Sequence, residues 1–157
     1  MLLRSCASYS KLVYNARTSP AASIAAELHL FDQDVRGAFC ELMRLSPDED
    51  TWARAQWATS LGGLGLRSCM QHAHAAFAAS VVNSASLQCA IWPALSVADV
   101  LAEPAAVAAF TALAPRLPQA LSMALASGEK VSQKRLSQAL DRAAFDEVLL
   151  HPATPQH

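Results

Sequence analysis

Apolar side chains recur along most of the chain at the three- and four-residue spacings of an α-helix, and no β-type alternation persists. The clearest case is residues 20–45, where Asp32 and Asp34 are expected to lie off the buried face. That face is predicted to carry Ile24, Leu28, Phe31, Val35, Phe39 and Leu42. The pattern predicts an all-α fold.

A second long helix is predicted over residues 69–92, where Pro93 stops it. Ser68 stands before its first residue, and a serine hydroxyl there accepts a backbone N–H that would otherwise lack a partner. Many of its residues are small, so neighbouring helices are expected to pack closely. One apolar stripe is expected, formed by Ala73, Ala76, Phe77, Ser80, Val81, Ser84, Leu87 and Ile91.

Shorter helices are predicted around these two. One spans residues 5–17, and another carries Trp52 and Trp57 behind a capping box that begins at Ser46. Beyond Pro93, helix starts are predicted at Ser96 and Pro104, and a helix end at Gly128. The last helix starts near Ser132, with Asp141 expected outside and an inner face of Leu136, Leu140, Ala144, Val148 and Leu149.

These elements make an irregular bundle of about six to eight helices. The central helix is expected to be the one that follows the glycine-rich turn. At 157 residues a single domain is expected, with a core over 5–92, an alanine- and proline-rich extension over 93–150 and a tail over 151–157.

The turn itself contains Gly62, Gly63 and Gly65. Glycines before a helix are typical of phosphate-binding loops. However, the Gly-Lys-Ser/Thr ending of the P-loop is absent, and Ser68 stands where a dinucleotide fingerprint needs its third glycine. A structural turn with a helix cap is therefore the favoured interpretation.

Charge and composition narrow the function classes. The net charge is −1 and the pI is about 6.5, which does not indicate a strongly basic nucleic-acid-binding protein. No apolar run is long enough to span a bilayer, so no membrane partner is expected. The four cysteines are scattered and are expected to be free thiols.

The first 26 residues carry Arg4, Lys11 and Arg17 but no acid. That composition is similar to a mitochondrial targeting segment, but a basic first helix is the favoured interpretation. An intracellular location, nuclear or cytoplasmic, is expected.

Two clusters are candidates for chemistry. Cys69 and His72 share a helix face and are a possible metal pair, but no CxxC or HExxH motif accompanies them. Trp52, Trp57 and Arg67 are candidates for stacking on a nucleic-acid strand, although core packing of the tryptophans is favoured. No cofactor and no metal are expected.

Several segments, in order, resemble the carboxyl-terminal, post-palm (thumb) region of a reverse transcriptase of the non-LTR (LINE-like) retrotransposon class. Residues 9–20 (YSKLVYNARTSP) resemble the helix that enters the thumb, and 31–36 (FDQDVR) the long helix that follows. The other matching segments are 57–68 (WATSLGGLGLRS), 72–80 (HAHAAFAAS) and 132–137 (SQKRLS).

The resemblance implies a remnant that contacts template and primer. Polymerase chemistry needs paired palm aspartates, and no Asp-Asp pair occurs, so no enzymatic activity is expected. Weak binding of RNA or an RNA–DNA hybrid is expected. The alternatives are a helical module that binds another polypeptide and an enzyme of an unrecognised class. The expected nucleic-acid contacts are Arg67, Lys130, Lys134 and Arg135.

Overall fold

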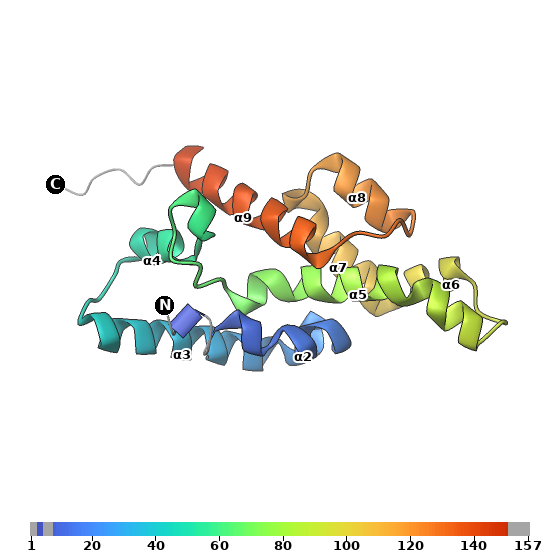
Figure 1. Cartoon of the computed structure of the whole chain (residues 1–157), viewed down its shortest axis with the longest axis horizontal. Helices are drawn as coiled ribbons and strands as arrows, with labels where there is room; N and C mark the ends of the chain where they lie inside the picture. Colours follow the sequence, from blue (N-terminus) through green and yellow to red (C-terminus); the bar gives the residue numbers. More distant parts are fainter. Residues whose placement is uncertain (1–2, 5–7, 151–157) are drawn as a thin grey trace.

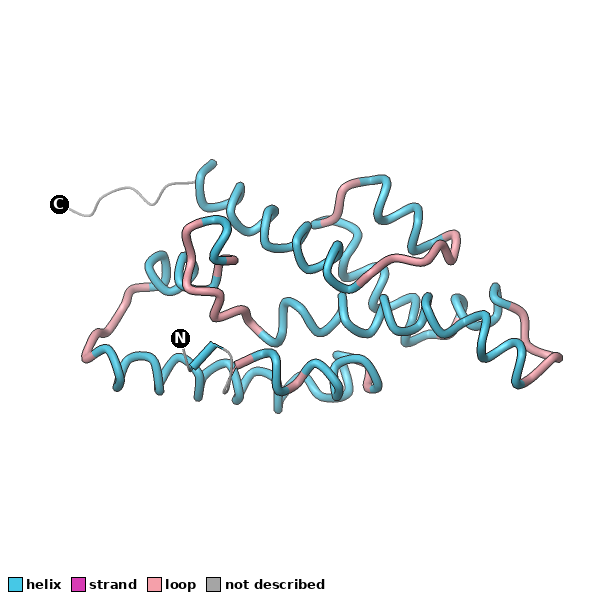
Figure 2. The backbone as a smooth tube through the Cα atoms, in the orientation of Figure 1, coloured by secondary structure: helices cyan, strands magenta, loops and turns pink. Residues whose placement is uncertain are grey.

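The computed structural model describes residues 3–4 and 8–150, and this part of the chain is all-α (Figure 1). Figure 2 shows helices joined by short loops, without a strand in the described residues. The α-helices are α2 (Val13–Thr18), α3 (Ala25–Met43), α4 (Glu49–Gln56), α5 (Cys69–Ile91), α6 (Val97–Ala102), α7 (Pro104–Leu113), α8 (Gln119–Ala126) and α9 (Gln133–Leu150). Short 3-10 turns are η1 (Tyr9–Lys11), η2 (Ala21–Ile24), η3 (Thr59–Leu61) and η4 (Ala114–Arg116).

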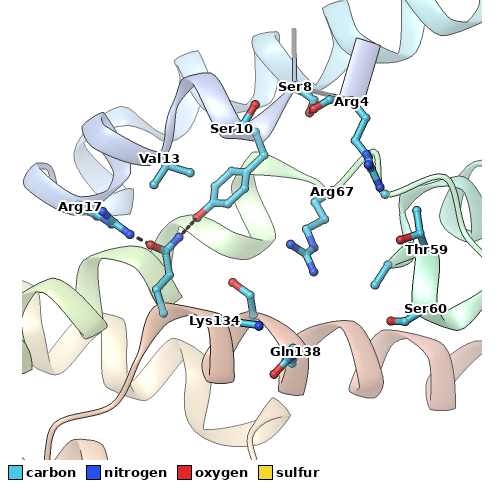
Figure 3. A pocket seen from close by; sticks show the side chains of 15 residues that line it. Arg4, Ser8, Ser10, Val13, Arg17, Thr59, Ser60, Arg67, Lys134 and Gln138 are labelled. Carbon is cyan, nitrogen blue, oxygen red and sulfur yellow. Dashed lines mark hydrogen bonds between the residues drawn. The ribbon is translucent and has the colours of Figure 1, made fainter. Parts of the chain in front are cut away.

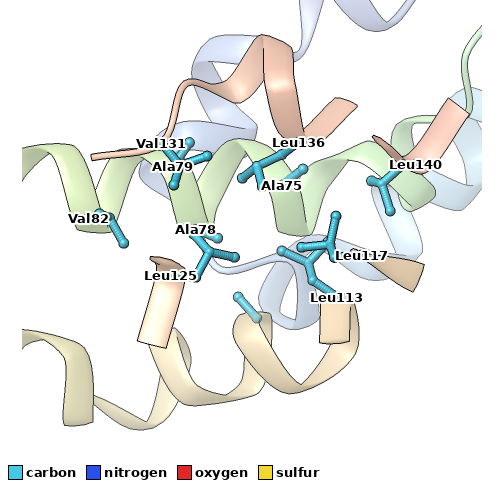
Figure 4. Packing of buried hydrophobic residues seen from close by; sticks show 11 residues of the cluster. Ala75, Ala78, Ala79, Val82, Leu113, Leu117, Leu125, Val131, Leu136 and Leu140 are labelled. Atoms are coloured by element: carbon cyan, nitrogen blue, oxygen red, sulfur yellow. The ribbon is translucent and has the colours of Figure 1, made fainter. Parts of the chain in front are cut away.

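Helix α5 is the centre of the bundle, as the sequence predicts. In Figure 1, α2 and α3 lie on one side of it and α8 and α9 on the other, while α7 passes behind it. Two separate clusters of buried residues therefore meet on α5. Ala73 and Ala76 belong to the cluster with α2 and α3, whereas Ala75, Ala78 and Ala79 belong to the larger cluster with α7, α8 and α9 (Figure 4).

The single stripe predicted for α5 is wrong at its far end. Leu87 and Ile91 are 61% and 76% exposed, while His72 and Val82 are almost fully buried. A helix with neighbours on two sides buries two faces, so a one-face pattern does not describe it. The many alanines let those neighbours approach closely without steric conflict.

The amino end of α5 has two caps. Ser68 Oγ accepts the Gln71 amide at 3.3 Å, which confirms the predicted cap. The second cap is Asp32 of α3, whose carboxylate accepts the amides of Cys69 at 2.7 Å and Met70 at 3.2 Å. Ser68 Oγ also donates to Asp32 at 2.6 Å. Asp32 was expected off the buried face of α3, but it lies on the same side as the buried Leu28 and Val35 and points at the start of α5.

The glycine-rich segment forms a turn before α5, as predicted. Gly62 and Gly65 have positive φ values of 84° and 70°, where other residues are strained. A Cβ on Gly63 would lie 2.3 Å from the Trp57 carbonyl oxygen, so this position needs glycine for close approach. Of the turn's leucines, Leu66 is buried, but Leu64 is 49% exposed.

Most of the remaining helix boundaries are confirmed. Ser96 and Asp99 form a capping box, Pro104 is the first residue of α7, and Gly128 follows α8 with φ 74°. Asp48, not Ser46, caps α4, because its carboxylate accepts the Thr51 amide at 2.8 Å.

Three other predicted boundaries differ. Helix α3 begins at Ala25 after a 3-10 turn rather than at Pro20, and α4 ends at Gln56, before Trp57. The predicted helix over 5–17 is divided into η1 and α2, and its residues 5–7 lie outside the described residues, as does the predicted tail. Within the described part of the chain, no helix is both long and apolar enough to cross a membrane.

The double cap yields a stability prediction. Asp32→Ala should lower the free energy of unfolding by about 1–3 kcal/mol, because two amides at the start of α5 lose their acceptor. Ser68→Asp should also destabilise, although aspartate is a good N-cap, because it places a second carboxylate beside Asp32.

Urea unfolding followed by circular dichroism measures both effects. The matched control is Asp34→Ala on the exposed side of α3, which should change little. A Ser68→Asp variant as stable as the wild type would show that the Asp32 contact does not control this helix end.

Candidate nucleic-acid interface

An open pocket of about 620 Å³ lies between the amino-terminal segment, the glycine-rich turn and α9 (Figure 3). We call it the basic pocket. It is lined by Arg4, Ser8, Tyr9, Ser10, Val13, Arg17, Ala58, Thr59, Ser60, Gly65, Arg67, Gln133, Lys134, Ser137 and Gln138.

Four cationic side chains line this pocket, and none of the described residues that line it is acidic. Figure 3 shows Arg4, Arg17, Arg67 and Lys134 around it, reaching it from separate segments of the chain. Several hydroxyl groups add polar lining between them. Guanidinium and ammonium groups of this kind bind phosphate and carboxylate oxygens. The pocket is therefore suited to an anion.

Arg17 is held in place by a chain of hydrogen bonds. Its Nε donates to Gln133 Oε1 at 2.8 Å, and Gln133 Nε2 donates to the Tyr9 hydroxyl at 2.9 Å (Figure 3). The Tyr9 hydroxyl in turn donates to the His72 carbonyl at 3.3 Å. Burial raises the pKa of Tyr9 to about 12, against the opposing effect of the Gln133 hydrogen bond. The phenol is therefore neutral and able to donate at neutral pH.

Arg67 is attached to a buried carboxylate. Its Nε donates to Asp141 Oδ1 at 3.2 Å, and its Nη2 donates to Oδ2. His72 Nε2 lies 3.4 Å from Asp141 Oδ1, and His72 Nδ1 is buried without a hydrogen-bond partner in the described structure. The Arg67 side chain remains 32% exposed, so part of it still faces the pocket.

The prediction that Asp141 lies outside is wrong, because the residue is only 5% exposed. Position 141 is adjacent to the inner face of α9, and Arg67 and His72 provide donors there. Burial alone would raise the pKa of Asp141, but hydrogen bonds from His72 and Arg67 hold it below its ordinary value. The predicted inner face also fails at Leu149, which is 59% exposed near the end of α9.

The structure brings two of the four predicted contact residues together. Arg67 and Lys134 line the basic pocket, whereas Lys130 and Arg135 are exposed outside it. Arg4 and Arg17 were not among the predicted contacts. Their signal was the acid-free, basic amino-terminal segment, whose composition indicated only a targeting segment or a basic first helix.

The candidate metal pair is occupied by other contacts. Cys69 is buried next to Asp32, and burial, with the nearby carboxylate, raises the pKa of its thiol. His72 faces Asp141. The described residues contain no group of three or more histidine, cysteine or acidic side chains placed to hold a metal ion. Cys40, Cys69 and Cys89 are free, and Cys6 lies outside the described residues.

Trp52 and Trp57, the two candidates for stacking on nucleic acid, instead pack against other side chains, which was the favoured interpretation. Trp52 is 7% exposed and lies against Phe39, with ring centroids 5.5 Å apart. The Trp57 ring packs edge-on against Phe145 of α9, with centroids 4.8 Å apart. Neither ring lines the basic pocket.

Comparison with protein families, curated proteins and solved structures finds no match to this chain.

The buried carboxylate yields a pH-dependent prediction. Asp141→Asn should lower the free energy of unfolding by about 2 kcal/mol at neutral pH, because Arg67 and His72 lose a charged partner. Since the folded-state pKa of Asp141 is lowered, its stabilisation is present above the unfolded-state pKa. It is lost as the pH falls through the folded-state value.

The difference between wild type and Asp141→Asn should therefore shrink below about pH 4. Urea unfolding at a series of pH values measures it. Asp146→Asn, which alters an exposed pair with Arg142 on the same helix, is the control and should cost at most about 0.5 kcal/mol. If Asp141→Asn lowered the free energy of unfolding by the same amount throughout the acid range, the lowered pKa of Asp141 would be contradicted.

Proposed function

We propose that this chain is a non-catalytic helical module that holds the backbone of RNA or an RNA–DNA hybrid in the basic pocket. The main support is the convergence of Arg4, Arg17, Arg67 and Lys134 on one open pocket, although the whole chain has a net charge of −1. The residues that resemble a reverse-transcriptase thumb include three of these four cations, and a thumb contacts template and primer.

Contact through phosphates is favoured over contact through bases. Sequence-tolerant recognition of single strands commonly uses exposed aromatic rings on which bases stack. Tyr9 is the only aromatic residue among those that line the pocket, and it is 7% exposed. Arginine and lysine side chains without such a platform bind phosphate oxygens, which carry no sequence information. Binding should be independent of sequence.

The affinity should be low. Arg67 shares its charge with Asp141, so the pocket presents fewer than four full charges to a ligand. We expect dissociation constants of about 10⁻⁴–10⁻⁶ M at physiological salt, as is typical of non-specific contacts. The free thiols at Cys40, Cys69 and Cys89 favour a reducing compartment, nuclear or cytoplasmic, as the place of this contact.

The test compares two double variants that remove the same charge. The pocket variant, Arg17→Ala with Lys134→Ala, removes two cationic side chains that line the pocket. The outside variant, Lys130→Ala with Arg135→Ala, removes two exposed cationic side chains outside it. Binding of a fluorescent RNA–DNA hybrid is followed by anisotropy across a salt series. The pocket variant should flatten the slope of log affinity against log salt by about 1–2. Each phosphate contact releases about one counterion on binding, and this variant makes up to two fewer such contacts.

The outside variant should leave the slope near the wild-type value. Equal effects of the two variants would place the contact on the general surface rather than in the pocket. Absence of binding at low salt would reject the proposal and leave the protein-interaction hypothesis ahead.

A further inference from the structure

A second hollow, which we call the apolar groove, lies next to the basic pocket. It has a volume of about 470 Å³ and is formed by the carboxyl-terminal end of α3, the glycine-rich turn and residues 3–4. Its lining residues are Leu3, Arg4, Phe39, Leu42, Met43, Thr59, Gly63, Leu64 and Leu66.

The groove exposes large apolar side chains to solvent. Leu42 is 71% exposed, Met43 is 54% exposed and Leu64 is 49% exposed. Contiguous apolar surface of this kind is costly in water and is typical of interaction sites. Small-molecule pockets usually enclose most of their ligand. Walls as exposed as these instead suit the apolar face of a helix laid along the surface.

The two hollows meet at Arg4 and Thr59, which line both. One end of the apolar groove therefore carries a positive charge, and the described residues that line the groove include no acid. Leu42 and Met43, in the last turn of α3, also line the groove. Unpaired carbonyl groups at a helix's carboxyl end carry partial negative charge, which disfavours an acidic group there.

We propose that the apolar groove binds an amphipathic helical segment of a partner protein, with an acidic residue at the end that lies over Arg4. The apolar side chains of that segment, at i, i+4 and i+7 spacing, contact Leu42, Met43 and Leu64. Its carboxylate pairs with the Arg4 guanidinium at the junction with the basic pocket. This contact goes beyond the proposed binding of nucleic acid, and Arg4 is the one cation that lines both hollows.

The probes are two labelled helical peptides of about four turns. Both carry leucines at i, i+4 and i+7, and they differ only in a terminal residue pair, Glu-Glu in one and Lys-Lys in the other. The acidic peptide should bind at least about tenfold more tightly, measured by anisotropy, because its carboxylates pair with Arg4 and the lysines are repelled. Arg4→Glu should reverse this order, which loss of folding cannot do.

Leu64→Asp should weaken binding of the acidic peptide by at least about tenfold, because it places a charge in the groove. Leu87→Asp, at a somewhat more exposed leucine on α5 outside both hollows, should leave it unchanged. The Arg17→Ala and Lys134→Ala variant should also leave it unchanged, so failure of this proposal is distinguishable from failure of nucleic-acid binding.

Three results would overturn the proposal. Equal binding of the two peptides, or no binding of either, would remove the acidic segment as the occupant. A dimer in sedimentation equilibrium that Leu64→Asp dissociates would assign the groove to a second copy of the chain. Uptake by phosphatidylglycerol vesicles that Leu64→Asp abolishes would assign it to a lipid surface.

Discussion

The arrangement of the helical bundle depends on the burial of α5 against helices on two sides. Its alanines allow α2 and α3 to approach on one side and α7, α8 and α9 on the other. Side chains of this size add little hydrophobic area each, so close contact over the helix's length is what holds the two halves together. The Asp32 carboxylate then fixes where α5 begins. The position of that helix end determines the positions of the glycine-rich turn and Arg67.

The charge distribution explains how a chain with a net charge of −1 forms a basic pocket. Several acids have structural partners: Asp32, Asp48 and Asp99 cap helices, and Asp141 pairs with the buried side of Arg67. Other acids pair with arginines elsewhere, such as Glu49 with Arg36 and Asp146 with Arg142. The amino-terminal segment contains no acid, and it lies against the start of α9. Its arginines therefore meet Lys134 without a neutralising neighbour in the described lining.

Features that depend on local sequence were predictable. Ser68, Ser96, Pro104 and Gly128 act on helix ends a few residues away, so their spacing to the neighbouring apolar positions was sufficient. Asp32 and Asp141 were expected outside because each was judged against its own helix. Asp32 accepts from the Cys69 amide, 37 residues further along the chain. Asp141 accepts from the Arg67 guanidinium, 74 residues earlier in the chain.

The candidate site was predictable only in part, because its side chains come from segments that are far apart in the sequence. Arg67 and Lys134 were selected because of their places near the turn and the start of the last helix, and they do line one pocket. Arg17 was not selected, since nothing local to it indicates that its Nε reaches Gln133, 116 residues further along the chain. The apolar groove was likewise hidden, because its walls come from three separate segments.

The most direct test is an NMR titration of isotope-labelled protein with an RNA–DNA hybrid at low salt. The pocket account predicts that the arginine Nε–H signals of Arg4 and Arg17 shift together with the backbone amides of Gly65, Lys134 and Gln138. Signals from the exposed pair Lys130 and Arg135 should move much less. Shifts confined to Lys130 and Arg135, or to the Leu42 and Leu64 groove, would contradict it.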